Sequence, residues 1–174
     1  MADAQVPTDE DLDAREREYS PSSCIGGNYQ PFIDAYASRS QAARSKTAGS
    51  LNLRYGAQPA QRLDLFVPPR PLSHQASPLP PLLVFIHGGY WQELSKEVSA
   101  FAASDCVQQG MAFAALDYTL APQARVAEMV VECRMALAWL HQHAATLGFD
   151  AKRIVVAGSS AGAHLAAMAA LPDG

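Results

Sequence analysis

A serine between two glycines carries the strongest chemical signal in this sequence. Ser160 stands in a Gly-x-Ser-x-Gly pattern with Gly158 and Gly162, directly after the β-branched run at residues 154–156 and directly before an alanine-rich stretch. A sharp turn from strand to helix would raise the serine hydroxyl above a sheet, where it can act as a nucleophile. The glycines would leave room where strand and helix approach each other. A structural turn is the alternative, because the pattern arises by chance in about one chain in twenty of this length.

A second glycine-rich segment, some seventy residues earlier, could supply hydrogen-bond donors for the same chemistry. Residues 81–86 are apolar throughout, which predicts a strand buried on both faces, and they lead directly into His87-Gly88-Gly89-Tyr90-Trp91. Backbone N–H groups in such a loop can stabilise the negative oxygen of a tetrahedral intermediate. The predicted donors are the N–H groups of Gly88, Gly89, Tyr90 and Ala161. Together the two motifs predict acyl transfer through a serine.

Four polar or aromatic side chains near these motifs could have a catalytic or a structural role. His87 is predicted to brace the glycine-rich loop, and Trp91 either lines a substrate pocket or packs beneath its own loop. His164 lies one helical turn after Ser160, so it is either a base for the serine or a packed helix residue. Asp117 ends an apolar run and is either a hydrogen-bonded structural carboxylate or the acid of a catalytic triad.

The composition indicates one globular unit without a nucleic-acid or membrane partner. The chain has 174 residues, of which 49% are hydrophobic and 17% charged, and its net charge is −4 with scattered basic residues. We see neither a signal peptide nor a membrane-spanning stretch, and therefore expect a cytoplasmic protein. The odd, widely spaced cysteines match neither a disulfide framework nor a zinc site, and we expect reduced, mostly buried thiols. No metal or organic cofactor is implied.

The pattern of the whole chain predicts an α/β fold. An acidic, flexible N-terminal segment is expected at residues 1–28 and the folded core at 29–174. An antiparallel hairpin of half-exposed strands should precede alternating strands and helices, which favour a mostly parallel sheet flanked by helices. The expected elements are a helix at 29–46, hairpin strands at 51–55 and 62–67, an exposed proline-rich connector at 68–81, strands at 81–86, 111–118 and from 153, and helices at 96–109 and 124–145.

Through these motifs, the chain resembles the α/β-hydrolase superfamily, and within it the arylformamidase (kynurenine formamidase) group and its bacterial esterase relatives. Three segments carry the resemblance: 87–91, 117–122 and 158–165. The resemblance implies a serine hydrolase with Ser160 as nucleophile, acting on a small-molecule formamide or ester. N-formylkynurenine, cleaved to kynurenine and formate, is the leading substrate, and short-chain or aryl esters are the alternative.

The same resemblance places two triad residues after the serine. The family order is serine, then aspartate or glutamate, then histidine. The sequence ends at Gly174, so it corresponds to about the N-terminal two-thirds of an α/β-hydrolase, truncated after the helix that follows Ser160. The alternative from another functional class is therefore a non-catalytic protein, an inactive fragment or pseudoenzyme that lacks the triad acid and base. A homodimer is compatible with the sequence, but the sequence does not show one.

Overall fold

The computed structural model describes residues 9–69 and 78–172. The chain divides into two compact units, Met1–Ala35 and Tyr36–Gly174. The first contains helix α1 (Asp9–Tyr19), a 3-10 helix η1 (Pro21–Ile25) and the first turn of α2 (Gln30–Lys46), where Asn28 Oδ1 accepts the Gln30 N–H at 3.1 Å. The boundary expected at residue 28 remains a prediction. Most of the expected proline-rich connector, residues 70–77, lies outside the described residues.

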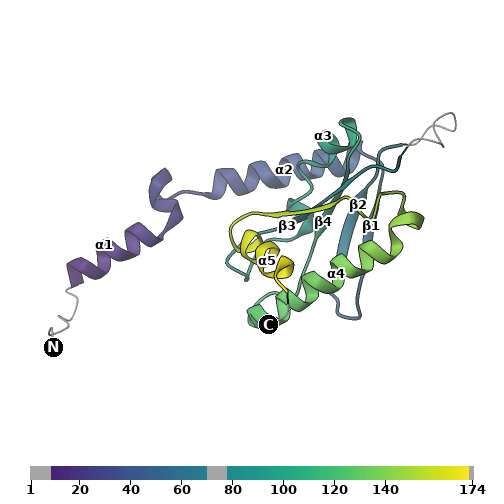
Figure 1. Cartoon of the computed structure of the whole chain (residues 1–174). Coiled ribbons are helices and arrows are strands. Elements are labelled where there is room, and N and C mark those ends of the chain that lie inside the picture. The colour runs from purple at the N-terminus through teal and green to yellow at the C-terminus, as the bar shows by residue number, and fades with distance from the viewer. Residues whose placement is uncertain (1–8, 70–77, 173–174) are drawn as a thin grey trace. The chain divides into compact units, whose positions relative to one another are not determined.

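The second unit is built on a mixed five-stranded sheet with the strand order β1-β2-β4-β3-β5 (Figure 1). β1 pairs with β2, and β2 with β4, in antiparallel orientation, whereas β3 pairs with both β4 and β5 in parallel. The predicted hairpin and the parallel strands behind it are therefore confirmed. The strands are β1 (Gly49–Arg54), β2 (Arg62–Phe66), β3 (Leu82–Ile86), β4 (Ala112–Leu116) and β5 (Ile154–Gly158).

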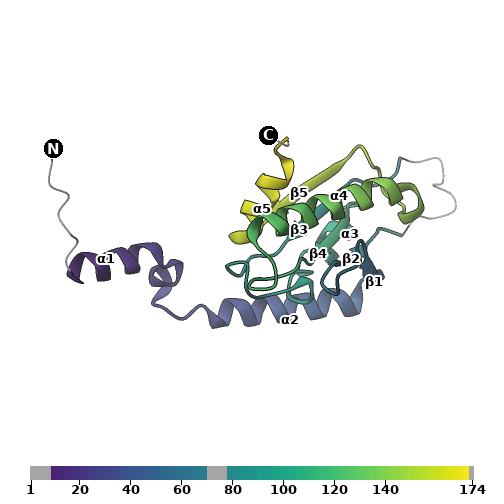
Figure 2. The same ribbon diagram turned by 90° about the horizontal axis from the view of Figure 1, so that it is seen from below.

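Helices of the second unit pack on both faces of this sheet (Figure 2). α4 (Val126–Leu147) and α5 (Ala161–Ala170) cover one face, and α3 (Ala103–Gln108) with the last turns of α2 covers the other. Alternate residues of β3 serve the two layers: Val84 packs with the α4 and α5 side, and Phe85 with the α2 and α3 side. This two-sided burial explains why β3 is apolar throughout.

One expected helix is wrong. Residues 96–109 form a 3-10 turn η3 (Lys96–Val98) and the separate, short α3 instead of a continuous helix. At the start of this segment the backbone N–H of Lys96 donates to Asp117 Oδ1, 21 residues further along the chain. The Ser99 hydroxyl donates to the Ser95 carbonyl, a local side-chain bond of the kind that competes with regular helix formation.

The expectation of two half-exposed hairpin strands is also wrong, because β2 is buried while β1 is largely exposed. β2 lies between β1 and β4 in the sheet. The alternation in its sequence comes from Asp64, which is fully buried and forms ion pairs with Arg44 at 2.6 Å and Lys96 at 3.4 Å. A buried carboxylate of this kind is tolerated because it is paired.

Candidate active site

Ser160 occupies a strained turn between β5 and α5. Its backbone torsions, φ 52° and ψ −119°, are rare for a residue with a side chain, and the side chain is exposed. A Cβ on Gly158 would lie 2.3 Å from backbone atoms of Gly162, and a Cβ on Gly162 would lie 2.1 Å from the Ile86 carbonyl oxygen. Both glycines of the pattern are therefore required by close backbone approach, as the sequence predicts.

The glycine-rich loop after β3 lies directly against this turn. A Cβ on Gly88 would lie 3.3 Å from Ser160 Cβ and 2.7 Å from the Ser159 carbonyl oxygen. The loop bends sharply here, because Gly89, Tyr90 and Trp91 all have positive φ values, 97°, 50° and 61°. The structure thus brings together the two motifs that the sequence places some seventy residues apart.

The backbone N–H groups at this junction are available to a ligand. Within residues 9–69 and 78–172, no protein hydrogen bond is formed by the N–H groups of Gly88, Gly89, Tyr90 and Ala161. Their neighbours do form such bonds, since the N–H groups of Gln92 and Glu93 donate to the Gly89 carbonyl at 2.9 and 3.0 Å. The N-terminus of α5 adds a partial positive charge beside Ser160. These features suit a site that receives a negatively charged oxygen.

His87 is held at the base of this loop. It is 2% exposed, its Nδ1 lies 2.9 Å from the Gly88 carbonyl oxygen, and its Nε2 lies 3.5 Å from Asp117 Oδ1. Its ring stacks on Tyr118 with centroids 4.5 Å apart, and the Tyr118 hydroxyl donates to the His87 carbonyl at 3.1 Å. Contacts on every side fit a histidine that braces the loop.

The side chains of Trp91 and His164 contact each other, and the His164 backbone N–H donates to the Ser160 carbonyl at 3.2 Å. Their rings meet edge to face with centroids 5.4 Å apart. The Trp91 Nε1 atom is buried without an acceptor among the described residues. In the same part of the chain, the Ser160 hydroxyl has no hydrogen-bond partner, so the geometry offers no support for His164 as its base. Trp91 packs at the edge of the core and contacts His164 of α5, the helix that begins directly after Ser160, so its position leaves both predicted roles open.

The contacts of Asp117 are those of a structural carboxylate. Its Oδ1 accepts the Lys96 N–H at 2.6 Å and lies close to His87, and no hydrogen bond joins it to Ser160 within the described ranges. Of the two interpretations that the sequence leaves open for this residue, the geometry favours the hydrogen-bonded carboxylate over the triad acid.

Two buried polar networks near the site escaped the sequence analysis. In the first, Lys96 is 1% exposed and pairs with Asp64. In the second, Glu132 of α4 accepts bonds from Gln61 Nε2 at 2.9 Å and from the N–H and hydroxyl of Thr119 at 2.7 and 2.9 Å. The only sequence signal for either was Asp64, a charged residue within an otherwise apolar strand.

Other functional classes find little support in the described residues. No group of three or more His, Cys, Asp or Glu side chains in that part of the chain could hold a metal ion. Burial and the nearby charge of Glu132 raise the pKa of the Cys133 thiol to about 12, which disfavours a thiolate nucleophile. Mostly buried thiols were expected, but Cys24 is exposed and Cys106 only partly buried. Among the helices that the structure describes, none combines the length and apolar character needed to cross a membrane.

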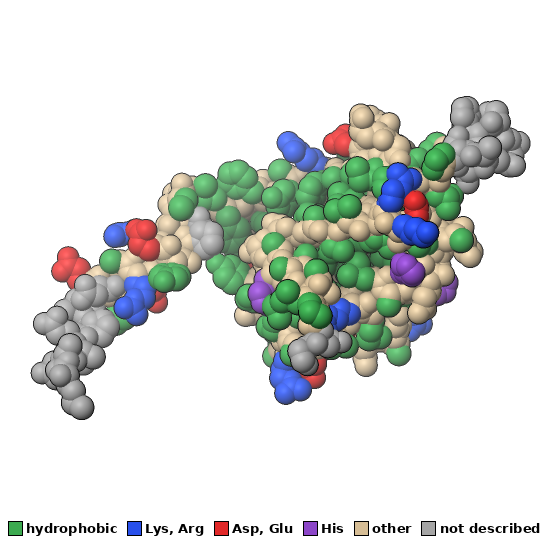
Figure 3. All heavy atoms as spheres, viewed as in Figure 1, with side chains coloured by type: hydrophobic (Ala, Val, Ile, Leu, Met, Phe, Trp, Pro, Cys, Tyr) green, Lys and Arg blue, Asp and Glu red, His purple; other side chains and the backbone are tan. Residues whose placement is uncertain are grey.

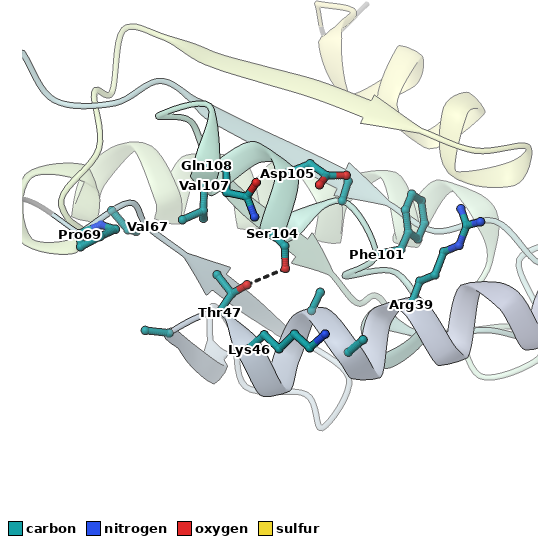
Figure 4. Close-up of a pocket in the computed structure, with 14 residues that line it drawn as sticks. Arg39, Lys46, Thr47, Val67, Pro69, Phe101, Ser104, Asp105, Val107 and Gln108 are labelled. Atoms are coloured by element: carbon teal, nitrogen blue, oxygen red, sulfur yellow. Dashed lines mark hydrogen bonds between the residues drawn. The ribbon is translucent and has the colours of Figure 1, made fainter.

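A separate hollow of about 990 Å³ lies on the α2 and α3 side of the sheet (Figure 4). Arg39 and Lys46 of α2 line it on one side, and Ser104 of α3 donates to or accepts from Thr47 across it at 2.7 Å. None of the residues predicted for the active site lines this hollow. The candidate chemistry is confined to the junction of the serine turn and the glycine-rich loop.

The mixed sheet, the helices on both of its faces and the turn from β5 to α5 define an α/β-hydrolase fold. Residues 63–174 match the model of the BD-FAE family. The chain belongs to the BD-FAE family, and its relatives place it with α/β-hydrolases of the arylformamidase and esterase type.

Three similar proteins illustrate this placement. The chain is 33% identical over 166 residues to the kynurenine formamidase of Danio rerio, covering 92% of this chain and 54% of that protein. It is 33% identical over 165 residues to the kynurenine formamidase of Salmo salar, covering 92% and 53%. The structure of inhibited esterase B from Lactobacillus rhamnosis superposes with a TM-score of 0.64 at 26% identity, covering 81% and 47%. The chain thus spans about half the length of the curated relatives it matches.

Proposed function

We propose that the full-length protein is a serine hydrolase that cleaves the formamide bond of N-formylkynurenine to give kynurenine and formate. The observation that carries the proposal is the position of Ser160, exposed on a strained turn and pressed against Gly88. Unused backbone N–H groups on both sides of the serine support it. The choice of a formamide substrate draws on the relatives named kynurenine formamidase.

In the proposed reaction, the Ser160 hydroxyl oxygen attacks the formyl carbon while its proton passes to a histidine base. The carbonyl oxygen becomes negatively charged and is stabilised by N–H groups of Gly88, Gly89 or Tyr90 from the loop and of Ala161 from α5. One donor of this kind typically lowers the barrier by roughly 3 kcal/mol. The C–N bond then breaks, the arylamine leaves with the proton, and a formyl ester remains on the serine. Water attacks this ester and releases formate.

The base and its carboxylate partner are assigned by resemblance alone. In α/β-hydrolases both follow the nucleophile along the chain. We therefore place them in the region that relatives of this protein possess beyond the equivalent of residue 174. His164, which contacts Trp91, and Asp117, which contacts Lys96 and His87, are not part of the proposed triad.

A carboxylesterase is the second candidate, and the likeness to esterase B supports it. The chemistry differs only in the leaving group, which would be an alcohol instead of an arylamine. Trp91, which belongs to the glycine-rich loop and contacts His164 of α5, suits an aromatic group in either substrate. Short-chain or aryl esters would therefore use the same oxyanion donors and the same nucleophile.

The test uses the full-length protein with two substrates. We expect kcat/KM for N-formylkynurenine to exceed that for p-nitrophenyl acetate, and Ser160→Ala to abolish both activities together with labelling by a fluorophosphonate probe. Ser159→Ala is the matched control, because it removes the neighbouring hydroxyl and should retain both. A clear preference for the ester would replace the formamidase assignment by an esterase. Absence of labelling and of turnover in the full-length protein would instead identify a pseudoenzyme.

A further inference from the structure

The loop at residues 87–96 is unusually strained for its length. It connects the end of β3 to η3 and contains Gly88, Gly89 and Tyr90, whose N–H groups are the proposed oxyanion donors. Besides the positive φ values at residues 89–91, Leu94 has φ 70°. Non-glycine residues remain in this region only where their surroundings fix them. Something must therefore hold the 87–96 loop in shape.

A single carboxylate oxygen contacts both ends of this loop. Asp117 Oδ1 accepts the N–H of Lys96, the first residue of η3, where the loop ends, at 2.6 Å. The same oxygen lies 3.5 Å from Nε2 of His87, the first residue of the loop. Asp117 belongs to neither end, because it follows β4 in the chain. Its side chain thus bridges two points that the loop itself separates.

Asp117 is itself firmly positioned. Its N–H donates to the Arg62 carbonyl at 3.0 Å, and its carbonyl accepts the Tyr55 hydroxyl at 2.7 Å. Burial, reinforced by the nearby charges of Glu132 and other groups, raises the pKa of Tyr55, so its hydroxyl keeps the proton that it donates. The side chain of Asp117 is 17% exposed. The carboxylate therefore projects from a backbone that is anchored on both sides.

Each end of the loop has a second anchor that does not involve this carboxylate. At one end, the Lys96 ammonium is buried and faces Asp64 at 3.4 Å. At the other end, Tyr118 stacks on His87 and donates to its carbonyl. These contacts fix where the loop starts and stops, whereas Asp117 fixes the two ends relative to each other.

We propose that Asp117 is a positioning residue that closes the 87–96 loop and thereby holds the N–H groups of Gly88, Gly89 and Tyr90 beside Ser160. The proposal rests on the proposed function for the role of those N–H groups. The inference that Asp117 closes the loop depends only on the contacts of Asp117 and is independent of the proposed function. Asp117 acts through the loop and does not touch the substrate.

Hydrogen exchange tests the closure independently of activity. In the full-length protein, Asp117→Ala should accelerate exchange of the hydrogen-bonded loop amides of Gln92, Glu93 and Lys96 by about tenfold or more, since a hydrogen bond to a charged acceptor is lost. Asp117→Asn should stay within about threefold of the wild type, because its amide oxygen can still accept the Lys96 N–H. Asp105→Ala on the exposed side of α3 is the control for removal of a carboxylate. Unchanged exchange in Asp117→Ala would overturn the proposal. If Asp117→Ala does not fold, the exchange of Asp117→Ser is measured in its place.

Steady-state kinetics then distinguishes positioning from a merely structural role. Asp117→Ala should lower kcat by about tenfold or more with KM within about threefold of the wild type, since donors to the transition state are displaced while substrate binding persists. Asp117→Asn should recover most of kcat. An equal loss of kcat in both variants would overturn the proposal, since it would assign the effect to the charge. If the wild type turns over neither substrate while Asp117→Ala accelerates loop exchange, the closure stands and the proposed function fails.

Discussion

A methyl group added to Gly88 would lie 3.3 Å from Ser160 Cβ and 2.7 Å from the Ser159 carbonyl oxygen. Gly88→Ala should therefore push the loop away from the serine, and we expect kcat/KM of the full-length protein to fall about 100-fold, the usual effect of a displacement near 1 Å. Gly110→Ala is the control, because a Cβ there meets nothing within 4 Å. Equal kcat/KM values for the two variants would contradict the role of this contact.

Gly158 should be essential for stability rather than for chemistry alone. A Cβ there would lie 2.3 Å from the Gly162 backbone, and neither strand nor helix can move away without disturbing its packing. We expect Gly158→Ala to lower the free energy of unfolding by about 3 kcal/mol, at the upper end for overpacking. Gly110→Ala should cost only about 1 kcal/mol from its positive φ. Urea denaturation of residues 1–174 measures both, and similar midpoints for the two variants would count against this prediction.

The buried pair of Lys96 and Asp64 should show strong coupling. Lys96→Met leaves the buried Asp64 carboxylate with Arg44 as its remaining cation, and we expect a loss of about 3 kcal/mol. The double variant with Asp64→Asn should lose clearly less than the sum of the two single variants, because neither charge is then left uncompensated. A double-mutant cycle by chemical denaturation gives the coupling energy. Additive losses would show that the two side chains do not interact.

Glu97 should make stability depend on pH. Burial works against its charged form, but hydrogen bonds from Lys96 and Ser95 outweigh it, and the pKa of Glu97 is lowered. The folded state therefore favours the carboxylate, so the stabilisation is present above the unfolded pKa of about 4.3 and is lost as the pH falls through the lower folded pKa. The difference in unfolding free energy between the wild type and Glu97→Gln should shrink as the pH is lowered from about 6 to about 3. A difference that is constant with pH would contradict this.

The exposed strand β5 should promote self-association of the chain 1–174. β5 lies at the edge of the sheet, Val155 is 57% exposed, and hydrophobic side chains gather on both sides of the strand's course (Figure 3). Unpaired N–H and C=O groups on an apolar edge strand invite pairing with another chain. We expect Val155→Lys to increase the monomeric fraction in gel filtration. Val131→Lys on α4 is the control for added charge, and an equal effect of both would exclude a specific role of the edge.

The features that were predictable from sequence are those encoded by neighbouring residues. β3 was recognisable because it is apolar on both faces, and the turn at Ser160 because both glycines stand within two residues of it. The short turn η3 was not recognisable, because the Lys96 N–H at its start is bonded to Asp117, 21 residues further along the chain. The burial of β2 was missed for a similar reason, since the charged partners of Asp64 lie on α2 and η3, more than nineteen residues away in the chain. Local patterns reveal strands and turns, whereas long-range ion pairs leave almost no local trace.

The strand order also bears on when the reactive serine can form. Among the strands that the structure describes, β5 pairs with β3 alone. Leu82 pairs with Ile154, and β4 and α4 lie between these two residues along the chain. Contacts between such distant residues require closure of a long loop and form slowly. The N–H groups of Gly88 and its neighbours come from the earlier strand, so nucleophile and donors meet only after this pairing. During synthesis, a chain that has not yet paired β5 with β3 therefore carries Ser160 as an ordinary, unactivated hydroxyl.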